Sequence, residues 1–287
     1  MHRLRSSIYA AFLTLFNVMG CASEESSASK ADTRPLVQGN SAEDQGVDAA
    51  PAPVAPLGEQ TQVIVGEALG RPARLFLPAG YTSERSWPMI VLLHGYSANG
   101  NLQDGIFRLK LRQSERGYLL LVPEGRRDMS GRQFWAATEA CCDFGPLGSM
   151  DDDVDYLGAL IEESAGVAAV DRAQVSLVGH SNGGYMSYRL ACERPDLISR
   201  IAVLAGTDNG LEALCQPQAP ISLLHIHGDE DPTVTYTPGG VSSGAEESAQ
   251  RWSAAAGCEP VPLNDGRLDL LPHIDGEETE QVRWLNC

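Results

Sequence analysis

The sequence predicts an α/β fold with a mostly parallel central sheet flanked by helices. From Thr61 onward, short β-branched runs alternate with longer amphipathic segments, the pattern of strand–helix units. Several of these runs are apolar throughout, as expected for strands buried on both faces. The alternation extends over about 225 residues, a length that a single hydrophobic core can support. We therefore expect one α/β domain over residues 61–287.

Each element follows from its own stretch of sequence. We expect strands at Gln62–Val65, Ala73–Leu77, Met89–His94, Tyr118–Val122, Val175–Gly179, Ile201–Leu204 and Ile221–Ile226. We expect helices at Leu102–Glu115, Val154–Ala165, Gly184–Cys192 and Ala245–Ala256. Ligands of such sheets bind at the carboxyl ends of the strands. Three turns with reactive side chains follow predicted strands, so we expect His94–Ser97, His180–Gly184 and His227–Asp231 to converge there.

The first sixty residues are expected to lie outside the domain. Residues 1–20 combine a basic start with the apolar stretch Ile8–Val18, which is typical of a secretory signal and too short for a membrane span. The segment ending in Cys21 resembles a bacterial lipobox, which implies cleavage before Cys21 and a lipid on its thiol. Plain secretion is the alternative. Residues 21–60 are polar and acidic, and we expect a disordered tether.

Charge and cysteine content limit the classes of partner. The net charge of −17 makes nucleic acid an improbable ligand. The export signal and an even six remaining cysteines favour three disulfides, with fifteen possible pairings. These are Cys141, Cys142, Cys192, Cys215, Cys258 and Cys287. We expect no metal, because no Cys-x-x-Cys pattern is present and the acidic run Asp151–Asp155 suits the first turn of a helix.

One motif predicts a nucleophile. The stretch Val175-Ser-Leu-Val-Gly-His-Ser-Asn-Gly-Gly184 is an apolar run that ends in Gly-x-Ser-x-Gly, and a helical pattern follows it. In this context the serine lies on a sharp strand-to-helix turn with its hydroxyl exposed. We therefore predict Ser181 as nucleophile and the Asn182 amide, at the helix N-terminus, as an oxyanion donor.

A second oxyanion donor is expected from the turn after the first buried parallel strand. In Leu92-Leu-His-Gly-Tyr-Ser97, Gly95 lets the chain turn back towards the serine and places the Tyr96 amide as donor. We expect His94 to be a structural residue beneath this turn.

The acid and the base are less clearly marked. Asp231 and Asp229 both follow the last predicted strand of the sheet, and Asp208 follows the strand before it. The chain order Ser, Asp, His requires a histidine after the acid. His273 alone follows Asp231, and it lies in an acidic, loop-like stretch that favours a surface position.

Together these motifs resemble the secreted polyhydroxybutyrate depolymerase and feruloyl/acetylxylan esterase group of α/β hydrolases. The resemblance runs from about residue 62 to the end. It rests on Leu93-His-Gly-Tyr96, Phe134-Trp-Ala-Ala137, Cys141-Cys142, Asp152-Asp-Val-Asp-Tyr-Leu157, Val178-Gly-His-Ser-Asn-Gly-Gly-Tyr-Met186, Ala191-Cys-Glu-Arg-Pro-Asp-Leu197, His227-Gly-Asp-Glu-Asp231 and Gly257-Cys258.

The resemblance implies Ser181 as nucleophile, Asp231 as acid, and the amides of Tyr96 and Asn182 as donors. It also implies cross-links joining Cys141 and Cys142 to Cys192 and Cys215, and Cys258 to Cys287. In that family a final strand and a Gly-Gly-His turn with the base follow the cysteine corresponding to Cys287. We expect a truncated chain that lacks this last strand and helix; loss of the base, or its replacement by His273, are the alternatives.

We therefore expect a lipid-anchored or secreted serine carboxylesterase that works through an acyl-enzyme without a cofactor. Its substrates would be polyester links such as polyhydroxybutyrate, or feruloyl, acetyl and short-chain esters. Trp135, with Phe134 and Tyr96, is expected to line the acyl site, although Trp135 also suits the core. A serine peptidase and a binding protein without a base are the alternative functions.

Overall fold

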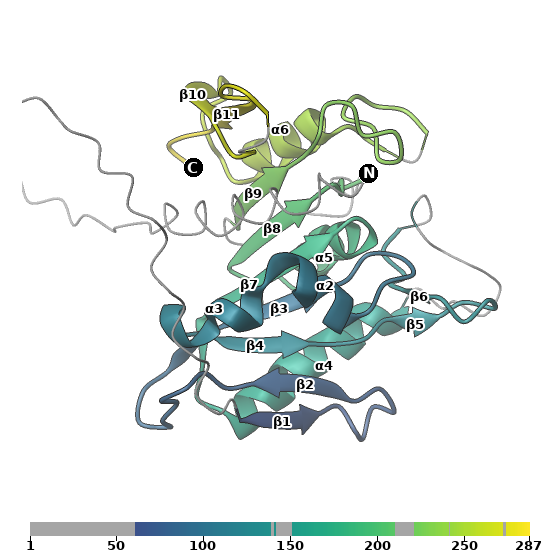
Figure 1. The fold of residues 1–287 in the computed structure, drawn as a ribbon, viewed down its shortest axis with the longest axis vertical. Helices are drawn as coiled ribbons and strands as arrows, with labels where there is room; N and C mark the ends of the chain where they lie inside the picture. Colours follow the sequence, from purple (N-terminus) through teal and green to yellow (C-terminus); the bar gives the residue numbers. More distant parts are fainter. Residues whose placement is uncertain (1–60, 139–140, 142–150, 210–220, 241, 272–273) are drawn as a thin grey trace, which may run out of the picture.

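A computed structural model describes residues 61–138, 141, 151–209, 221–240, 242–271 and 274–287 (Figure 1). The predicted signal segment, Cys21 and the tether lie outside these residues. A seven-stranded sheet forms the centre, in the order β1-β2-β4-β3-β7-β8-β9. Its strands are β1 (Gln62–Val65), β2 (Ala73–Phe76), β3 (Trp87–Leu93), β4 (Leu119–Val122), β7 (Val170–His180), β8 (Arg200–Leu204) and β9 (Ser222–Ile226). All seven predicted strands are present.

Most of this sheet is parallel, as the uninterrupted apolar runs predict. β4, β3, β7, β8 and β9 pair in parallel, whereas β1 and β2 pair antiparallel to each other and β2 to β4. The carboxyl ends of the parallel strands therefore lie at one edge of the sheet. This edge carries the turns that follow β3, β7 and β9.

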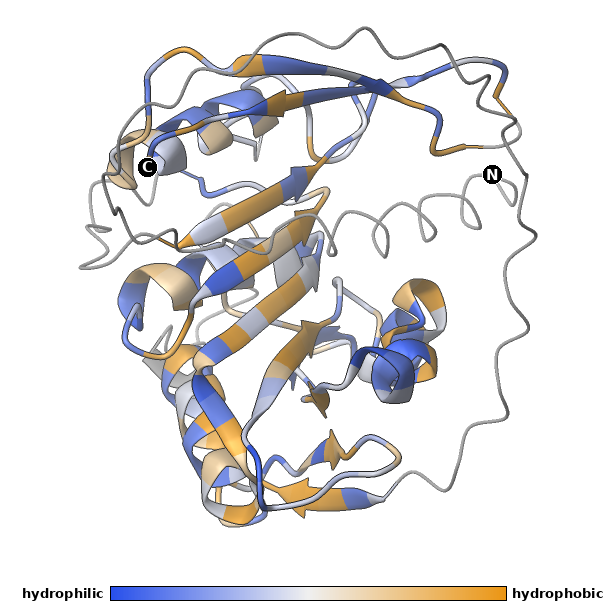
Figure 2. Ribbon diagram, turned by 90° about the vertical axis from the view of Figure 1, so that its left-hand side faces the viewer, coloured by the Kyte–Doolittle hydropathy of each residue, from blue (hydrophilic) through white to orange (hydrophobic). Residues whose placement is uncertain are grey.

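Helices cover both faces of the sheet (Figures 1 and 2). They are α2 (Gly100–Phe107), α3 (Leu109–Arg116), α4 (Asp151–Val167), α5 (Asn182–Glu193) and α6 (Ala245–Ala255). Successive residues of β3 enter opposite cores, because side chains alternate across a strand. Val91 and Leu93 pack with residues of α4 and α5, whereas Ile90 and Leu92 pack with residues of α2 and α3.

The single helix predicted over Leu102–Glu115 is wrong, since the structure has two helices there. Arg108 adopts the left-handed conformation, with φ 56°, between α2 and α3. Asp104 stabilises the break, because its backbone oxygen accepts from the Arg108 N–H at 2.6 Å and its side chain accepts from the Lys110 N–H at 2.9 Å. The hydrogen bonds of Asp104 do not alter the apolar periodicity of residues 102–115, so the sequence pattern gave no sign of the break between the two helices.

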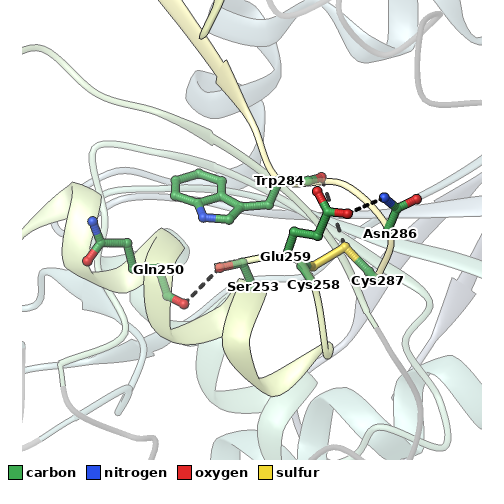
Figure 3. Close-up of a disulfide and its surroundings, with 7 residues drawn as sticks. All are labelled: Gln250, Ser253, Cys258, Glu259, Trp284, Asn286 and Cys287. Carbon is green, nitrogen blue, oxygen red and sulfur yellow. Dashed lines mark hydrogen bonds between the residues drawn. A yellow bond between two sulfur atoms is a disulfide. The ribbon is translucent and has the colours of Figure 1, made fainter. Parts of the chain in front are cut away.

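Two small hairpins lie outside the central sheet, and the sequence did not predict them. β5 (Arg126–Arg127) pairs with β6 (Gln133–Phe134), and β10 (Leu263–Leu268) pairs with β11 (Thr279–Arg283). β10 is almost entirely exposed, so it lacks the apolar pattern of a strand. A disulfide between Cys258 and Cys287 joins the two ends of the second hairpin, as the family resemblance implied (Figure 3). No helix of the described residues is long and apolar enough to cross a membrane.

Candidate active site

Ser181 lies at the sharp turn between β7 and α5. Its backbone has φ 52° and ψ −121°, a strained conformation that is common at functional sites. The turn is fixed by three hydrogen bonds: the Ser181 N–H donates to Leu204 O at 2.9 Å, and Ser181 O accepts from Gly184 N and Tyr185 N at 2.7 and 3.0 Å. The strand, turn and helix that the Gly-x-Ser-x-Gly motif requires are therefore all present.

The two glycines of the motif are required by close backbone contacts. A Cβ on Gly179 would lie 2.2 Å from Gly183 O, and a Cβ on Gly183 would lie 2.3 Å from Leu93 O. Both distances are far inside van der Waals contact, so a side chain at either position would displace the backbone of β3 or α5.

The turn after β3 packs against Ser181, as predicted. A Cβ on Gly95 would lie 3.5 Å from Ser181 Cβ and 3.1 Å from His180 Nδ1. The Tyr96 amide belongs to this turn, and Asn182 is the first residue of α5. Amides in the first turn of a helix have no carbonyl partner within that helix. The two predicted oxyanion donors thus belong to backbone segments that contact Ser181.

His94 has a structural role beneath this turn. Its Nε2 lies 2.9 Å from the Gly125 N–H, which can only donate, so Nε2 is unprotonated. The proton is therefore on Nδ1, which donates to Gly95 O at 2.8 Å. Burial lowers the pKa of His94 and favours the neutral form, and the two hydrogen bonds select the tautomer protonated on Nδ1.

The expectation that Trp135 lines the substrate pocket is wrong for this structure. The Trp135 side chain has no exposed surface, so it cannot contact a bound molecule. Its indole N–H donates to His94 O at 2.9 Å. Tyr96 is half-buried, and its hydroxyl donates to Asp128 Oδ2 at 2.7 Å. Phe134 is buried.

Sequence reasoning missed Gln103, which also supports the turn. This fully buried residue of α2 accepts the Gly95 N–H on its Oε1 at 3.1 Å. Its Nε2 has no hydrogen-bond partner among the described residues. An amphipathic helix pattern gives no sign that one of its glutamines faces inward.

Asp231 presents one carboxylate oxygen to its own loop. Oδ1 accepts from the backbone N–H groups of Thr233 and Val234 at 2.8 and 2.9 Å. Oδ2 has no hydrogen-bond donor within reach among the described residues; the ring of His227 is 3.9 Å away. The carboxylate is therefore oriented by the backbone and retains one oxygen for a further donor. Asp229, the alternative acid in this loop, is exposed.

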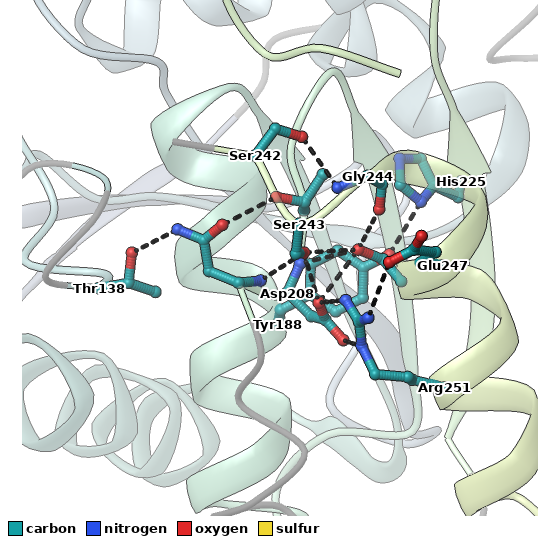
Figure 4. A network of polar contacts seen from close by, with 12 residues as sticks. Thr138, Tyr188, Asp208, His225, Ser242, Ser243, Gly244, Glu247 and Arg251 are labelled. Atoms are coloured by element: carbon teal, nitrogen blue, oxygen red, sulfur yellow. Dashed lines mark hydrogen bonds and ion pairs between the residues drawn. The ribbon is translucent and has the colours of Figure 1, made fainter. Parts of the chain in front are cut away.

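Asp208 is the other alternative, and its carboxylate is fully occupied (Figure 4). Arg251 of α6 contacts it through two nitrogens at 2.5 and 3.0 Å. The hydroxyls of Ser243 and Ser248 also donate to it, at 2.9 and 3.1 Å. This buried ion pair connects the end of β8 to α6, which is a structural role.

Three side chains connect α5 to the Asp231 loop by directed hydrogen bonds. His227 Nε2 lies 2.7 Å from Val234 O, which only accepts, so this nitrogen carries the proton. His227 Nδ1 therefore accepts from His225 Nε2 at 3.2 Å, and His225 Nδ1 accepts from the Tyr188 hydroxyl at 3.0 Å. Burial, with a smaller contribution from His227, lowers the pKa of His225 to about 3, so this residue stays neutral.

None of these three histidines is hydrogen-bonded to Ser181 or to a carboxylate of the described residues: the ring nitrogens of His94 bond to backbone groups of Gly95 and Gly125, and those of His225 and His227 bond to Tyr188, to each other and to Val234 O. His180, next to Ser181, packs against Gly95; burial lowers its pKa and the charge of Asp231 opposes that shift. His273 lies outside the described residues.

The other cysteines are described only in part. Cys192 is disulfide-bonded, and Cys141 Sγ accepts from Asn182 Nδ2 at 3.8 Å. Cys142 and Cys215 lie outside the described residues, so the pairing of these four stays a prediction.

Comparison with known proteins agrees with this geometry. Residues 68–214 match the protein family described as "Putative esterase". The chain is 33% identical over 145 residues to "Putative esterase NocK" of Nocardia uniformis subsp. tsuyamanensis, a match that covers 50% of this chain and 40% of that protein. It is 29% identical over 206 residues to feruloyl esterase C of Emericella nidulans, covering 69% of this chain and 67% of that protein.

A solved structure supports the fold. The acetyl xylan esterase of Aspergillus awamori superposes with a TM-score of 0.53 at 14% identity, over 71% of this chain and 83% of that one. The central sheet, its helices and this likeness identify the α/β-hydrolase fold, which confirms the predicted fold class.

Proposed function

Because this chain belongs to the esterase family that its residues 68–214 match, we propose that it hydrolyses carboxylic ester bonds through an acyl-enzyme on Ser181. One observation carries the proposal: the strained Ser181 elbow lies beside the turn after β3, so closely that a Cβ added to Gly95 would come within 3.5 Å of Ser181 Cβ. Nucleophile and oxyanion donors must converge in this way for acyl transfer.

In the proposed reaction Ser181 Oγ attacks the ester carbonyl carbon and transfers its proton to a histidine base. The carbonyl oxygen becomes an oxyanion, which the amides of Tyr96 and Asn182 stabilise. Collapse of the tetrahedral intermediate breaks the ester C–O bond, and the alcohol leaves with the proton from the histidine. Water then attacks the acyl-enzyme by the same route and releases the acid. No cofactor takes part.

We assign Asp231 as the acid, because its Oδ2 is the carboxylate oxygen that remains for a histidine N–H while Oδ1 is held by the backbone. The carboxylate of Asp208 already accepts hydrogen bonds from Arg251 and from the hydroxyls of Ser243 and Ser248. The base is assigned to a histidine that reaches both Asp231 Oδ2 and Ser181 Oγ, and His273 is the histidine that follows Asp231 in the sequence.

The proposed substrates are feruloyl, acetyl and other short-chain esters, since proteins named for feruloyl and acetylxylan ester hydrolysis match this chain in sequence or in fold. Polyester such as polyhydroxybutyrate belongs to the same proposal, through the sequence resemblance alone.

The test is hydrolysis of p-nitrophenyl butyrate and methyl ferulate by the full chain and by Ser181→Ala. Where the parent turns over either ester, we expect a loss of at least about 10³-fold in Ser181→Ala, because removing the nucleophile eliminates the acyl-enzyme route. Turnover that survives in Ser181→Ala would contradict the assignment. A folded parent without turnover that still binds ester would favour the binding-protein alternative, and amide hydrolysis faster than ester hydrolysis would favour the peptidase.

Asp231→Asn and Asp229→Asn form a matched pair for the acid, since both lie in one loop and, among the described residues, Asp231 alone of the two accepts backbone N–H groups. We expect a loss of about 10⁴-fold in kcat for Asp231→Asn and parental activity for Asp229→Asn; the reverse order would reject Asp231. His273→Ala, measured beside them, identifies His273 as the base if kcat falls to the level of Asp231→Asn. Parental activity in His273→Ala would exclude this residue.

We also propose that residues 1–20 direct export and that Cys21 carries a lipid. The basic and apolar order of these residues supports this proposal. The Cys258–Cys287 disulfide supports an oxidising compartment. Mass spectrometry of the N-terminal peptide tests it: a diacylglyceryl mass on Cys21 is expected, and an unmodified peptide that begins after a different cleavage site would contradict it.

A further inference from the structure

The two proposed oxyanion donors come from segments far apart in the chain. Tyr96 follows β3, whereas Asn182 begins α5. Both amides must lie about 2.7–3.1 Å from a single oxygen atom in the transition state. The spacing between the turn and the helix end therefore matters directly to the rate.

The side chain of Asn182 fixes one part of this spacing. Its Oδ1 accepts from the Trp135 N–H at 2.7 Å, and its Nδ2 donates to Trp135 O at 2.8 Å. Together these two hydrogen bonds hold the Trp135 backbone to the start of α5. The Asn182 side chain is wholly buried, so water does not compete for either hydrogen bond.

The side chain of Trp135 fixes the other part. Its indole N–H donates to His94 O at 2.9 Å, and its ring lies 4.9 Å from the ring of His94, centre to centre. His94 in turn donates from Nδ1 to Gly95 O, next to the Tyr96 amide. His94, like Trp135, has no exposed surface. A continuous buried path thus leads from Asn182 through Trp135 and His94 to the turn.

We propose that Trp135 is a positioning residue that holds the two oxyanion donors at a fixed spacing, acting through Asn182 on one side and His94 on the other. Trp135 touches neither the substrate nor the reacting atoms. A fully satisfied polar path in a low-dielectric interior is rigid, and functional groups are held in place by buried hydrogen-bonded neighbours of this kind. This inference rests on the proposed function for its effect on rate, although not for its effect on structure.

The test compares Trp135→Phe with Trp87→Phe. The control removes an equivalent hydrogen bond, because Trp87 is also buried and its indole donates to Thr82 O at 2.8 Å, at the opposite end of β3 from the turn. We expect Trp135→Phe to lower kcat by about 10- to 100-fold with little change in KM, since a misplacement of about 1 Å can cost 10²-fold. Trp87→Phe should keep the parental kcat at a similar loss of thermal stability.

Amide hydrogen exchange gives a readout that does not depend on turnover. We expect faster exchange in Trp135→Phe in both segments, 94–98 and 180–184, and unchanged exchange there in Trp87→Phe. Parental exchange in these segments together with parental kcat in a folded Trp135→Phe would overturn the inference. If the parent itself shows no esterase activity, the proposed function fails, and the exchange measurement alone still decides on the positioning role.

Asn182→Ala serves as a second variant if Trp135→Phe does not fold. It keeps the backbone amide and removes both contacts to Trp135, so we expect the same fall in kcat and the same accelerated exchange. Residues on one path are not additive; Trp135→Phe should therefore add little to Asn182→Ala. Full additivity of the two effects on kcat would contradict a shared path.

Discussion

The substitution Gly183→Ala tests whether close packing of the elbow controls both stability and rate. The added Cβ would lie 2.3 Å from Leu93 O, 2.6 Å from the Leu93 carbonyl carbon and 2.6 Å from His94 O. The optimal separation between carbon atoms is about 3.5–4.0 Å, so the backbone of α5 or of the turn must shift by about 1 Å.

The expected cost is about 1–3 kcal/mol, as for other overpacked sites. A domain of this size loses about 2–4 °C of Tm per kcal/mol, so a fall of about 2–12 °C is expected. A shift of about 1 Å at the oxyanion turn should also lower kcat by about 100-fold. Circular dichroism melting and hydrolysis of p-nitrophenyl butyrate measure the two effects.

Gly105→Ala is the matched control. Gly105 lies in α2, is exposed, and has no atom within 4 Å of an added Cβ. Alanine is favoured over glycine in a helix by up to about 1 kcal/mol, so this variant should melt slightly higher and keep the parental kcat. If Gly183→Ala kept both the parental Tm and the parental kcat, the packing argument would be refuted.

Three further perturbations follow from the described contacts. Asp208→Asn should lower stability by about 3 kcal/mol in urea denaturation, because it removes the buried carboxylate charge that pairs with Arg251, while the more exposed Glu247 carboxylate stays 3.6 Å from that guanidinium; an unchanged denaturation midpoint would show that the Asp208–Arg251 ion pair does not contribute to stability. The folded-state pKa of His225, about 3, lies below its ordinary value, so only the unfolded chain binds this proton between about pH 6.5 and 3. Stability should then fall with decreasing pH by up to about 1.4 kcal/mol per unit, and His225→Gln should flatten that slope; an identical slope in this variant would contradict the assignment. Reducing the Cys258–Cys287 disulfide opens a link between residues 29 apart and should cost about 3–4 kcal/mol; hydrogen exchange in β10 and β11 should accelerate, and unaltered protection there would count against it.

The positions of Ser181, Gly95 and Asp231 follow from local sequence, because each lies in the turn or loop that follows an apolar strand. An apolar run that is buried on both faces marks a parallel strand, and the parallel strands of one sheet end at the same edge. The contact between Gly95 and Ser181 could therefore be anticipated from the order of the motifs.

The role of Trp135 was decided by tertiary structure. An aromatic residue beside a catalytic motif suits a pocket wall or a core equally well, and an indole N–H can find a hydrogen-bond partner in either place. Only the fold brings His94 O within 2.9 Å of that nitrogen and covers the ring completely.

The choice between Asp208 and Asp231 also depended on the tertiary structure. The sequence placed a carboxylate after each of two neighbouring strands, but ion pairing depends on residues that are distant in the chain. Arg251 lies 43 positions from Asp208 and reaches it from α6, whereas the backbone of its own loop orients Asp231. The sequence by itself determined the fold class, the strand-turn-helix elbow at Ser181 and the edge of the sheet where the candidate site lies, because periodicity and turn chemistry are local. The tertiary structure alone decided which side chains are buried and which carboxylate oxygen remains for a partner, because these depend on contacts between segments that the chain order does not reveal.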